Sequence, residues 1–199
     1  MSAPDGWPPE RRALASLLLR RAFRFGDFAL SSGGRSPYYF DGRQVSLHGP
    51  GARLVGPALL ALARADGVSA VGGPAIGADP LVTAIAFSSA LDGGALVDAF
   101  IVRPQPKAHG AGGAIAGPPL HPGQRVALAD DALTTGRSLV EAAARVRETG
   151  AEIVAAYVLV DREEGDAAGR LAAAGLPVRA LFRRSELLTP AGEPRPELA

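Results

Sequence analysis

Apolar residues from about residue 50 onward follow two alternating patterns. Short runs that are almost wholly apolar predict buried strands, and the longer segments between them repeat apolar residues at helical spacing. Strands that alternate with helices predict a parallel sheet covered on both faces, which is an α/β fold. The predicted strands are 68–73, 95–102, 125–130, 152–161 and 177–182, and the predicted helices are 50–65, 79–91, 134–150 and 165–174.

The N-terminal segment has a different pattern. Residues 9–24 predict a helix, because their apolar residues recur at helical spacing up to Phe25. Alternating aromatic residues in 23–30 then indicate a short strand. A turn rich in Ser and Gly and a second aromatic segment, 36–40, follow it.

Glycine and proline punctuate the predicted elements. Asp79 and Pro80 fit the N-cap and first position of a helix, and Gly150 fits a C-cap. Residues 103–124 are rich in Gly and Pro and show no periodicity, which predicts a long loop. From Thr189 the chain is rich in Pro and Glu, and we expect a frayed tail.

Ligands of open parallel sheets bind beyond the carboxyl ends of the strands. The unusual loops of this sequence follow the predicted strands at those ends. We therefore expect a ligand site built from the loops 73–78, 103–117, 130–138 and 161–165.

Composition excludes several classes of protein. The 199 residues are 47% hydrophobic and 21% charged, which argues against disorder despite 25 Gly and 17 Pro. The net charge of +1 gives no overall basic field for nucleic acid. The chain has no cysteine, so disulfides, thiolate zinc sites and cysteine nucleophiles are excluded. No apolar run is long enough to span a bilayer, and the acidic, Pro-containing start is unlike a signal peptide, so we expect a cytoplasmic protein without membrane contact.

The basic residues are almost all arginine: 20 are Arg and one is Lys107. Arg103, Lys107 and His109 lie close together in the Gly- and Pro-rich segment, where no stable helix can form. A mobile basic loop suits closure over an anion during catalysis. The alternative is an ordinary solvated surface loop, with the single lysine there by chance.

An apolar strand that ends in two acids is the strongest chemical feature. Asp130 and Asp131 follow the run 126–129, and a turn with Thr134, Thr135 and Ser138 then opens a helix. Free N–H groups at a helix start bind phosphate, and neighbouring carboxylates can accept hydrogen bonds from sugar hydroxyls. The pattern favours a sugar phosphate, and the alternative is a capped helix beside two solvated acids.

The string 126–138 resembles the phosphoribosyl pyrophosphate (PRPP) binding motif of the type I phosphoribosyltransferases. In that family the two acids hold the ribose hydroxyls and the following turn holds the 5′-phosphate. The resemblance implies these roles for Asp130 and Asp131 and for the turn that follows them. The PRPP-binding set that it implies is Arg103, Lys107, His109, Asp130, Asp131, Ala132, Leu133, Thr134, Thr135, Gly136, Arg137 and Ser138.

Further segments resemble the orotate phosphoribosyltransferases. Residues 28–41 are similar to their N-terminal signature, 103–110 to their catalytic loop, and 160–165 to their Asp-Arg-x-x-Gly segment. Gly77-Ala78-Asp79-Pro80 matches a loop of one bacterial branch. These motifs occur in the family's order over residues 10–188, which makes them more specific together than singly.

The resemblance implies a type I phosphoribosyltransferase fold, with a mostly parallel central sheet flanked by helices. It divides the chain into an N-terminal helix and hood (1–50), a core (51–188) and a flexible tail (189–199). The implied reaction is orotate plus PRPP giving orotidine 5′-monophosphate and pyrophosphate, in pyrimidine (UMP) biosynthesis. The implied catalytic residues are Arg103, Lys107, His109, Asp130 and Asp131, and the implied orotate contacts are Thr134 and Arg162. The Ser-Pro context of Tyr39 and Phe40 predicts that they line the base pocket, and the alternative is that Tyr38, Tyr39 and Phe40 are core strand aromatics.

The same resemblance implies Mg²⁺ as cofactor, held mainly through the substrate and not by a protein metal site. It also implies a homodimer in which the loop 103–117 reaches the partner's site. Two departures weaken the match: Pro104 and Ser31 stand where the family commonly has lysine. Charge-assisted contacts are worth roughly 1.5–3 kcal/mol each, so we expect weaker PRPP binding.

Two other functions remain open at this point. A phosphoribosyltransferase for another base would share the motif 126–138 but would not need Arg162 to bind a carboxylate. A PRPP-binding regulator on the same fold would bind the ligand without turnover. Arg162 itself has a plainer alternative, a surface ion pair with Asp161 or Glu163.

Overall fold

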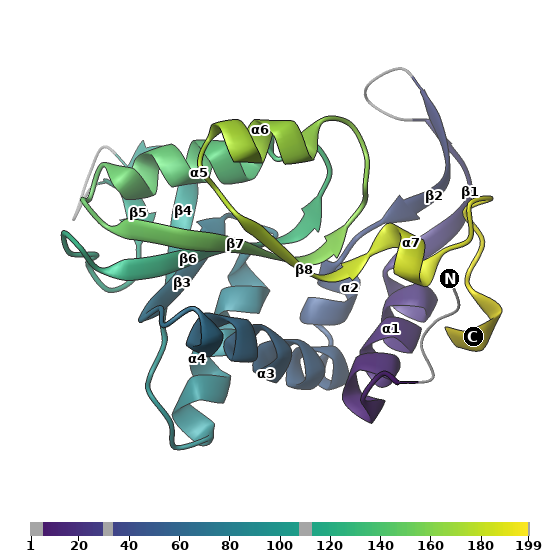
Figure 1. Ribbon diagram of the computed structural model, residues 1–199, viewed down its shortest axis with the longest axis horizontal. Coiled ribbons are helices and arrows are strands. Elements are labelled where there is room, and N and C mark those ends of the chain that lie inside the picture. Colours follow the sequence, from purple (N-terminus) through teal and green to yellow (C-terminus); the bar gives the residue numbers. More distant parts are fainter. Residues whose placement is uncertain (1–5, 30–33, 108–112, 199) are drawn as a thin grey trace.

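One six-stranded sheet forms the centre of the computed structural model, which describes residues 6–29, 34–107 and 113–198 (Figure 1). Its strands are β3 (Ala70–Pro74), β4 (Asp98–Lys107), β5 (Gly113–Ala116), β6 (Arg125–Leu133), β7 (Glu152–Asp161) and β8 (Val178–Arg183). They lie in the order β5-β4-β3-β6-β7-β8, and every neighbouring pair is parallel except β4 and β5.

Helices cover both faces of this sheet. Figure 1 shows α3 (Gly49–Ala65) and α4 (Asp79–Leu91) on one face, and α5 (Arg137–Arg147) and α6 (Ala167–Ala173) on the other. Each face has its own core of buried apolar side chains, because strands covered on both sides bury every residue. The predicted α/β architecture is confirmed.

The order of the strands creates a switch point beside β3. From β3 the chain runs outward through α4 to β4 and β5, and then returns to place β6 on the other side of β3. The connections that leave β3 and β6 therefore diverge. Such a divergence opens a crevice at the carboxyl ends of the two strands, where ligands of open α/β sheets bind.

A small hood stands apart from the main sheet (Figure 1). It consists of α1 (Pro9–Arg21), the antiparallel strands β1 (Phe23–Ala29) and β2 (Arg35–Phe40), and the short α2 (Arg43–Ser46). The helix predicted to reach residue 24 ends at Arg21, and Phe25 belongs to β1. The helix therefore ends where the alternating aromatic residues of β1 begin, three residues before the end predicted from helical spacing.

Within the segment predicted as a long loop, 103–107 and 113–116 are antiparallel strands, which we call the basic arm. β4 continues to Lys107, and β5 pairs back antiparallel with it. Beyond Val102 the pairing of β4 with β3 has ended, so Pro104 and Pro106 interrupt no ladder on that side. The strand extension was not predicted because a segment rich in proline and glycine is typical of a loop.

Two helix ends and the tail also differ from expectation. α4 begins at Asp79 itself, with Ala78 as the N-cap and no side-chain cap. α5 ends at Arg147 with Glu148 as its C-cap, short of Gly150. β8 is followed by α7 (Arg184–Leu187). In the segment expected to be a frayed tail, a 3₁₀ helix forms at Pro196–Leu198, and Leu198 is buried in the same core cluster as Leu14 and Leu18 of the hood.

None of the helices in the described residues has the length and apolar character needed to span a membrane.

Candidate active site

Two carboxylates lie toward the carboxyl end of β6, against the loop that follows β3. The Asp130 residue is only 7% exposed, and Asp131 is half-buried. The Ser138 hydroxyl donates to Asp130 Oδ2 at 3.0 Å, and the Asp131 backbone N–H donates to Asp130 Oδ1 at 3.0 Å. Both of these donors to Asp130, which come from the described residues, are neutral.

Glycines bring backbone against these carboxylates from both sides. A Cβ at Gly77, in the loop after β3, would lie 2.7 Å from Asp130 Oδ1 and 2.8 Å from Asp131 Oδ1. A Cβ at Gly42, before α2, would lie 2.8 Å from the Asp131 Cβ. Real side chains do not tolerate such distances, so any larger residue at position 77 would displace the pair. The loop after β3 and the end of β6 thus form one site.

Burial governs the ionisation of both acids. Loss of solvent, together with the neighbouring Asp131 charge, raises the pKa of Asp130 to about 7. The pKa of Asp131 is also raised by burial, although the positive charge of Arg43 opposes that shift. Two carboxyl groups in such a position favour ligands that bring hydrogen-bond donors or positive charge.

The turn from Thr134 to Ser138 follows directly. Gly136 is the N-cap of α5 with φ of +72°, a left-handed conformation that glycine adopts without strain, and no side chain caps the helix. Among the described residues no side chain therefore caps the first N–H groups of α5, and helix starts of this kind bind anions. Arg137 is exposed and donates to Glu141 at 2.7 Å.

Arg145, which the sequence analysis did not identify, holds the basic arm where the arm begins, at Arg103 and Pro104. Arg145 of α5 donates to the backbone carbonyls of Arg103 and Pro104, the latter at 2.8 Å. The Arg103 guanidinium itself donates to the carbonyls of Gly113 at 3.1 Å and Ile115 at 3.4 Å across the hairpin. Arg103 thus braces the arm.

Three predicted positions are at or beyond the limits of the structure. Lys107 is the last residue of β4. His109 and Ser31 lie outside the described residues, and their predicted roles stay predictions.

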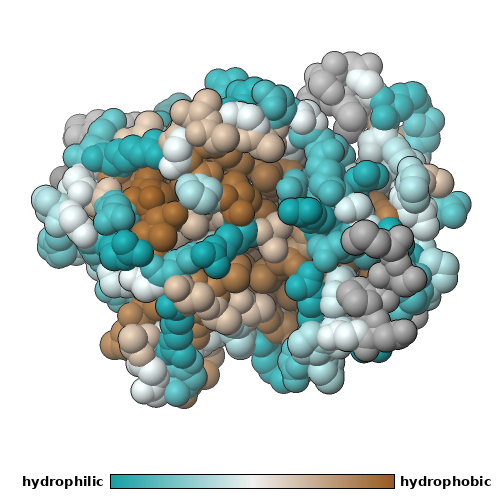
Figure 2. Space-filling view, in the orientation of Figure 1, coloured by the Kyte–Doolittle hydropathy of each residue, from teal (hydrophilic) through white to brown (hydrophobic). Residues whose placement is uncertain are grey.

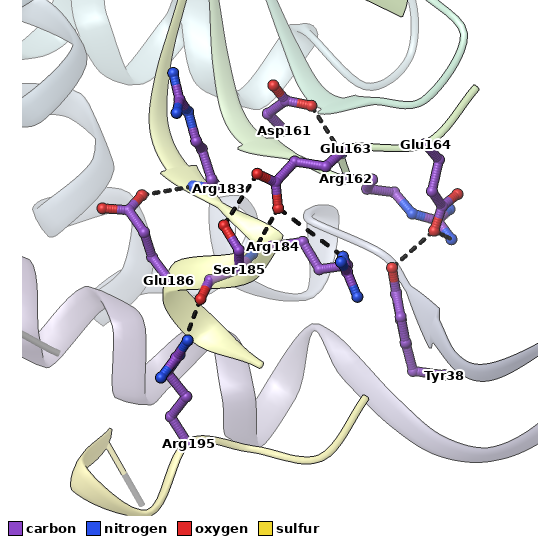
Figure 3. Close-up of polar contacts among 10 residues, drawn as sticks. All are labelled: Tyr38, Asp161, Arg162, Glu163, Glu164, Arg183, Arg184, Ser185, Glu186 and Arg195. Carbon is purple, nitrogen blue, oxygen red and sulfur yellow. Dashed lines mark hydrogen bonds and ion pairs between the residues drawn. The ribbon is translucent and has the colours of Figure 1, made fainter. Parts of the chain in front are cut away.

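Arg162 follows β7 and is brought to the same end of the sheet. Its backbone N–H donates to the Leu133 carbonyl at 3.0 Å, which places it beside Thr134. Its side chain is 12% exposed and pairs with Glu164 at 2.9 Å, while its guanidinium lies 5.3 Å from the ring centre of Tyr38 (Figure 3). The expected alternative, a surface pair with Asp161 or Glu163, is not what the structure has.

The two aromatic residues predicted to contact the base occupy different surroundings. Tyr39 is 45% exposed and packs against Phe28, whereas Phe40 is buried in the hood core, 4.9 Å from Phe23 between ring centres. Because side chains alternate along a strand, Tyr38 shares the buried face of Phe40. Tyr38 is therefore the aromatic residue in contact with Arg162.

A separate cavity of about 1130 Å³ lies between α6 and β8. Figure 2 shows brown, apolar surface gathered in the hollow there. Small residues such as Ala168, Ala172 and Ala180 line it, and of the segment 130–138 only Leu133 reaches it. This cavity is therefore distinct from the paired carboxylates.

Comparisons with known proteins agree with one another. The family model for the phosphoribosyl transferase domain matches residues 70–170. The orotate phosphoribosyltransferase of Aquifex aeolicus is 41% identical over 184 residues, covering 90% of this chain and 98% of the relative. The solved orotate phosphoribosyltransferase of Mycobacterium tuberculosis H37Rv with Fe(III) dicitrate is 38% identical with a TM-score of 0.78, covering 89% of this chain and 98% of that one. The same enzyme in complex with PRPP is 35% identical, with a TM-score of 0.74 and coverage of 89% and 98%.

Proposed function

The chain belongs to the orotate phosphoribosyltransferase family, and from that membership we propose that it transfers the phosphoribosyl group of PRPP to orotate. The products are orotidine 5′-monophosphate and pyrophosphate, and the reaction serves UMP synthesis. One observation supports the proposal beyond family membership: a buried and a half-buried carboxylate lie beside a helix start that has no side-chain cap, at the switch point of the sheet.

Asp130 and Asp131 bind the ribose in this proposal. A ribose ring offers two neighbouring hydroxyl donors, and the paired carboxylates offer neighbouring acceptors; the positive charge of Arg43 acts on Asp131. Hydroxyl groups that donate to the two acids lower their pKa, so ribose binding favours their ionised form. The close backbone at Gly77 keeps both carboxylates in place.

The turn 134–138 binds the 5′-phosphate. Its glycine N-cap leaves the first N–H groups of α5 available, and the hydroxyls of Thr134, Thr135 and Ser138 add donors. Ala132, Leu133 and Arg137 belong to the same PRPP-binding segment and are proposed to contribute backbone N–H groups.

Arg103, Lys107 and His109 neutralise the pyrophosphate as it leaves. Within the described residues no cluster of three or more His, Asp and Glu side chains could hold a metal ion. Mg²⁺ is commonly bound by one or two carboxylates together with substrate phosphates, and the pair Asp130 and Asp131 fits that donor set. When bound with the substrate, Mg²⁺ supplies positive charge that makes pyrophosphate a better leaving group.

Arg162 and Thr134 orient orotate, and the exposed Tyr39 contributes from the hood, whereas Phe40 is buried in the hood core and is not available to the base. Arginine binds carboxylates through two parallel hydrogen bonds, and orotate carries the carboxylate that other bases lack. The bond between C1′ and the pyrophosphate oxygen breaks before the new bond between C1′ and the orotate nitrogen forms. Catalysis is then chiefly positioning and charge neutralisation around an oxocarbenium-like ribose.

We also propose a homodimer in the cytoplasm. Exposed apolar side chains gather on and beside α4, which is unusual for a surface that stays in water. A second copy of the chain is the occupant we propose, and the family resemblance adds that the arm of one subunit reaches the site of its partner. The exposed residues are Leu47, Ile76, Phe87, Leu91 and Leu96.

Subunit mixing tests the shared site. Lys107→Ala and Asp131→Asn should each be nearly inactive alone. In a fully exchanged equal mixture, about a quarter of wild-type activity should return, because half of the dimers contain one intact site. No recovery after exchange would place the arm in its own subunit's site.

A screen of bases tests the activity itself. Orotate, uracil, hypoxanthine and adenine are each incubated with PRPP and Mg²⁺, and pyrophosphate release is measured. We expect release with orotate alone. Turnover of another base would indicate a different transferase, and PRPP binding without release from any base would indicate a regulator.

The departure at Pro104 has its own test. Proline brings neither charge nor N–H to the arm, and its carbonyl is held by Arg145. Pro104→Lys adds a cation and should lower the KM for PRPP by about threefold to tenfold. An unchanged KM would show that position 104 does not face the pyrophosphate.

A further inference from the structure

Arg162 has an internal carboxylate partner. Its Nη2 donates to Glu164 Oε1 at 2.9 Å, whereas its Nε is buried and has no hydrogen-bond partner within the described residues. Nε and Nη2 lie on one edge of the guanidinium, the edge that holds a carboxylate by two parallel bonds. Glu164 therefore fills only half of that edge.

The same glutamate oxygen has a second partner in the hood. The Tyr38 hydroxyl donates to Glu164 Oε1 at 2.7 Å, so one oxygen joins Arg162 to Tyr38 (Figure 3). Tyr38 is buried, whereas the Glu164 side chain is 31% exposed. Glu164 thus has room to move, and it has a donor that would remain if Arg162 were taken by another group.

The backbone around this pair is fixed by the neighbouring residue. Glu163 has φ of +54°, and its carboxylate accepts hydrogen bonds from the Ser185 N–H at 2.7 Å and the Ser185 hydroxyl at 3.0 Å. Asp161 Oδ1 accepts the Glu163 N–H at 2.9 Å (Figure 3). Because the loop is anchored in this way, Glu164 can leave Arg162 by a side-chain movement alone.

We propose that Glu164 is a specificity-determining residue that occupies Arg162 until the carboxylate of the base replaces it, and that Tyr38 holds the displaced Glu164. A base without a carboxylate cannot make this exchange and meets an arginine that is already paired. The inference rests on the proposed orotate activity.

The first test is Glu164→Gln, which keeps an acceptor for Arg162 and Tyr38 but removes the competing charge. The KM for orotate should fall about fivefold, kcat should change less than KM, and the KM for PRPP should stay within about twofold. Glu152→Gln is the matched control, since Glu152 pairs with Arg125 at 3.3 Å at the far end of β6 and should leave both KM values unchanged.

The second test is Tyr38→Phe. Without the tyrosine hydroxyl, Glu164 has only Arg162 as a partner, so the KM for orotate should rise about threefold. In the Glu164→Gln background the same substitution should have no effect on that KM. A purely structural role of Tyr38 would raise the KM equally in both backgrounds.

The outcomes separate this inference from the activity on which it rests. Loss of all orotate turnover in the wild-type protein would overturn the proposed function. With orotate turnover present, a KM that rises in Glu164→Gln would overturn the inference, because Glu164 would then support the bound arginine. Equal effects of Tyr38→Phe in both backgrounds would overturn it as well.

Discussion

Two buried aspartates at opposite ends of the sheet have opposite surroundings. The Asp66 side chain, beyond α3, is 5% exposed and is paired with the guanidinium of Arg179. It also accepts the Tyr157 hydroxyl at 2.9 Å, and its backbone carbonyl accepts Arg125 at 2.8 Å. Asp130 is as deeply buried but receives one hydroxyl and one backbone N–H, beside a second carboxylate.

The comparison separates a structural carboxylate from a binding one. A buried carboxylate with a cation and a hydroxyl donor is satisfied within the folded chain. Burial together with Asp66 raises the pKa of Tyr157, which keeps that hydroxyl a donor. At Asp130 the same burial without a cation raises the pKa to about 7, so the charge is left for a ligand to stabilise.

The largest effect should come from neutralising the binding pair. Asp130→Asn or Asp131→Asn should lower kcat/KM for orotate with PRPP by about a hundredfold to a thousandfold, because hydrogen bonds to charged acceptors are lost. Steady-state kinetics measures the loss. Retention of full activity in either variant, with an intact fold by circular dichroism, would remove that carboxylate from the site.

The next effect concerns stability and has a defined sign. In the folded chain Asp130 keeps its proton up to about pH 7, whereas in the unfolded chain it loses it near pH 4. The folded state therefore binds more protons between these values, and its stability falls as pH rises through them. Asp130→Asn removes this loss and should be more stable than wild type at pH 8, on the order of 2–4 kcal/mol.

Denaturant unfolding at pH 4 and pH 8 measures the difference. The advantage of Asp130→Asn should be small at pH 4 and full at pH 8. An advantage of equal size at both pH values would mean that the carboxyl charge is not its cause. The variant would then be stabilised by packing.

Asp66→Asn should act in the opposite direction. It leaves Arg179 without its anionic partner and should lower the free energy of unfolding by about 1–3 kcal/mol at pH 7. Orotate turnover should remain, since Asp66 lies at the other end of the sheet. If Asp66→Asn were as stable as wild type, Asp66 would not be a structural carboxylate and the contrast with Asp130 would be wrong.

The smallest effect should follow from Tyr157→Phe. This substitution removes one donor to Asp66 but keeps Arg179, and the ring remains packed in the core. A loss of about 0.5–1.5 kcal/mol is expected from one hydrogen bond, again by denaturant unfolding. If Tyr157→Phe lowered the free energy of unfolding more than Asp66→Asn does, the tyrosine hydroxyl and not the ion pair would be the main stabilising partner of Asp66.

The sheet was predictable because its strands are buried on both faces. The apolar run 152–161 matches β7 residue for residue. The predicted end of β6 at residue 130 was early, because Asp131 and the residues up to Leu133 resemble the start of a loop. Likewise, the prolines of the arm concealed β4 beyond Val102, where the strand no longer needs donors toward β3.

The site was predictable only where its residues are close in sequence. Asp130, Asp131 and Ser138 belong to one motif, and the structure brings them together. Tyr38 and Glu164 are 126 residues apart, so no local pattern joins them. Arg145 reads as an ordinary surface charge on a helix, because its partners are backbone carbonyls that carry no sequence signal.

The hydrogen bonds of Arg145 divide the arm into two parts, an inner end at Arg103 and Pro104 that is bonded to α5 and an outer end beyond them. The carbonyls at 103 and 104 are bonded to α5, the helix that begins at the turn proposed to bind the 5′-phosphate. Substitutions or length changes beyond Lys107 should therefore alter the reach and charge of the arm without loosening this attachment. The inner end of the arm would then keep its position relative to that turn.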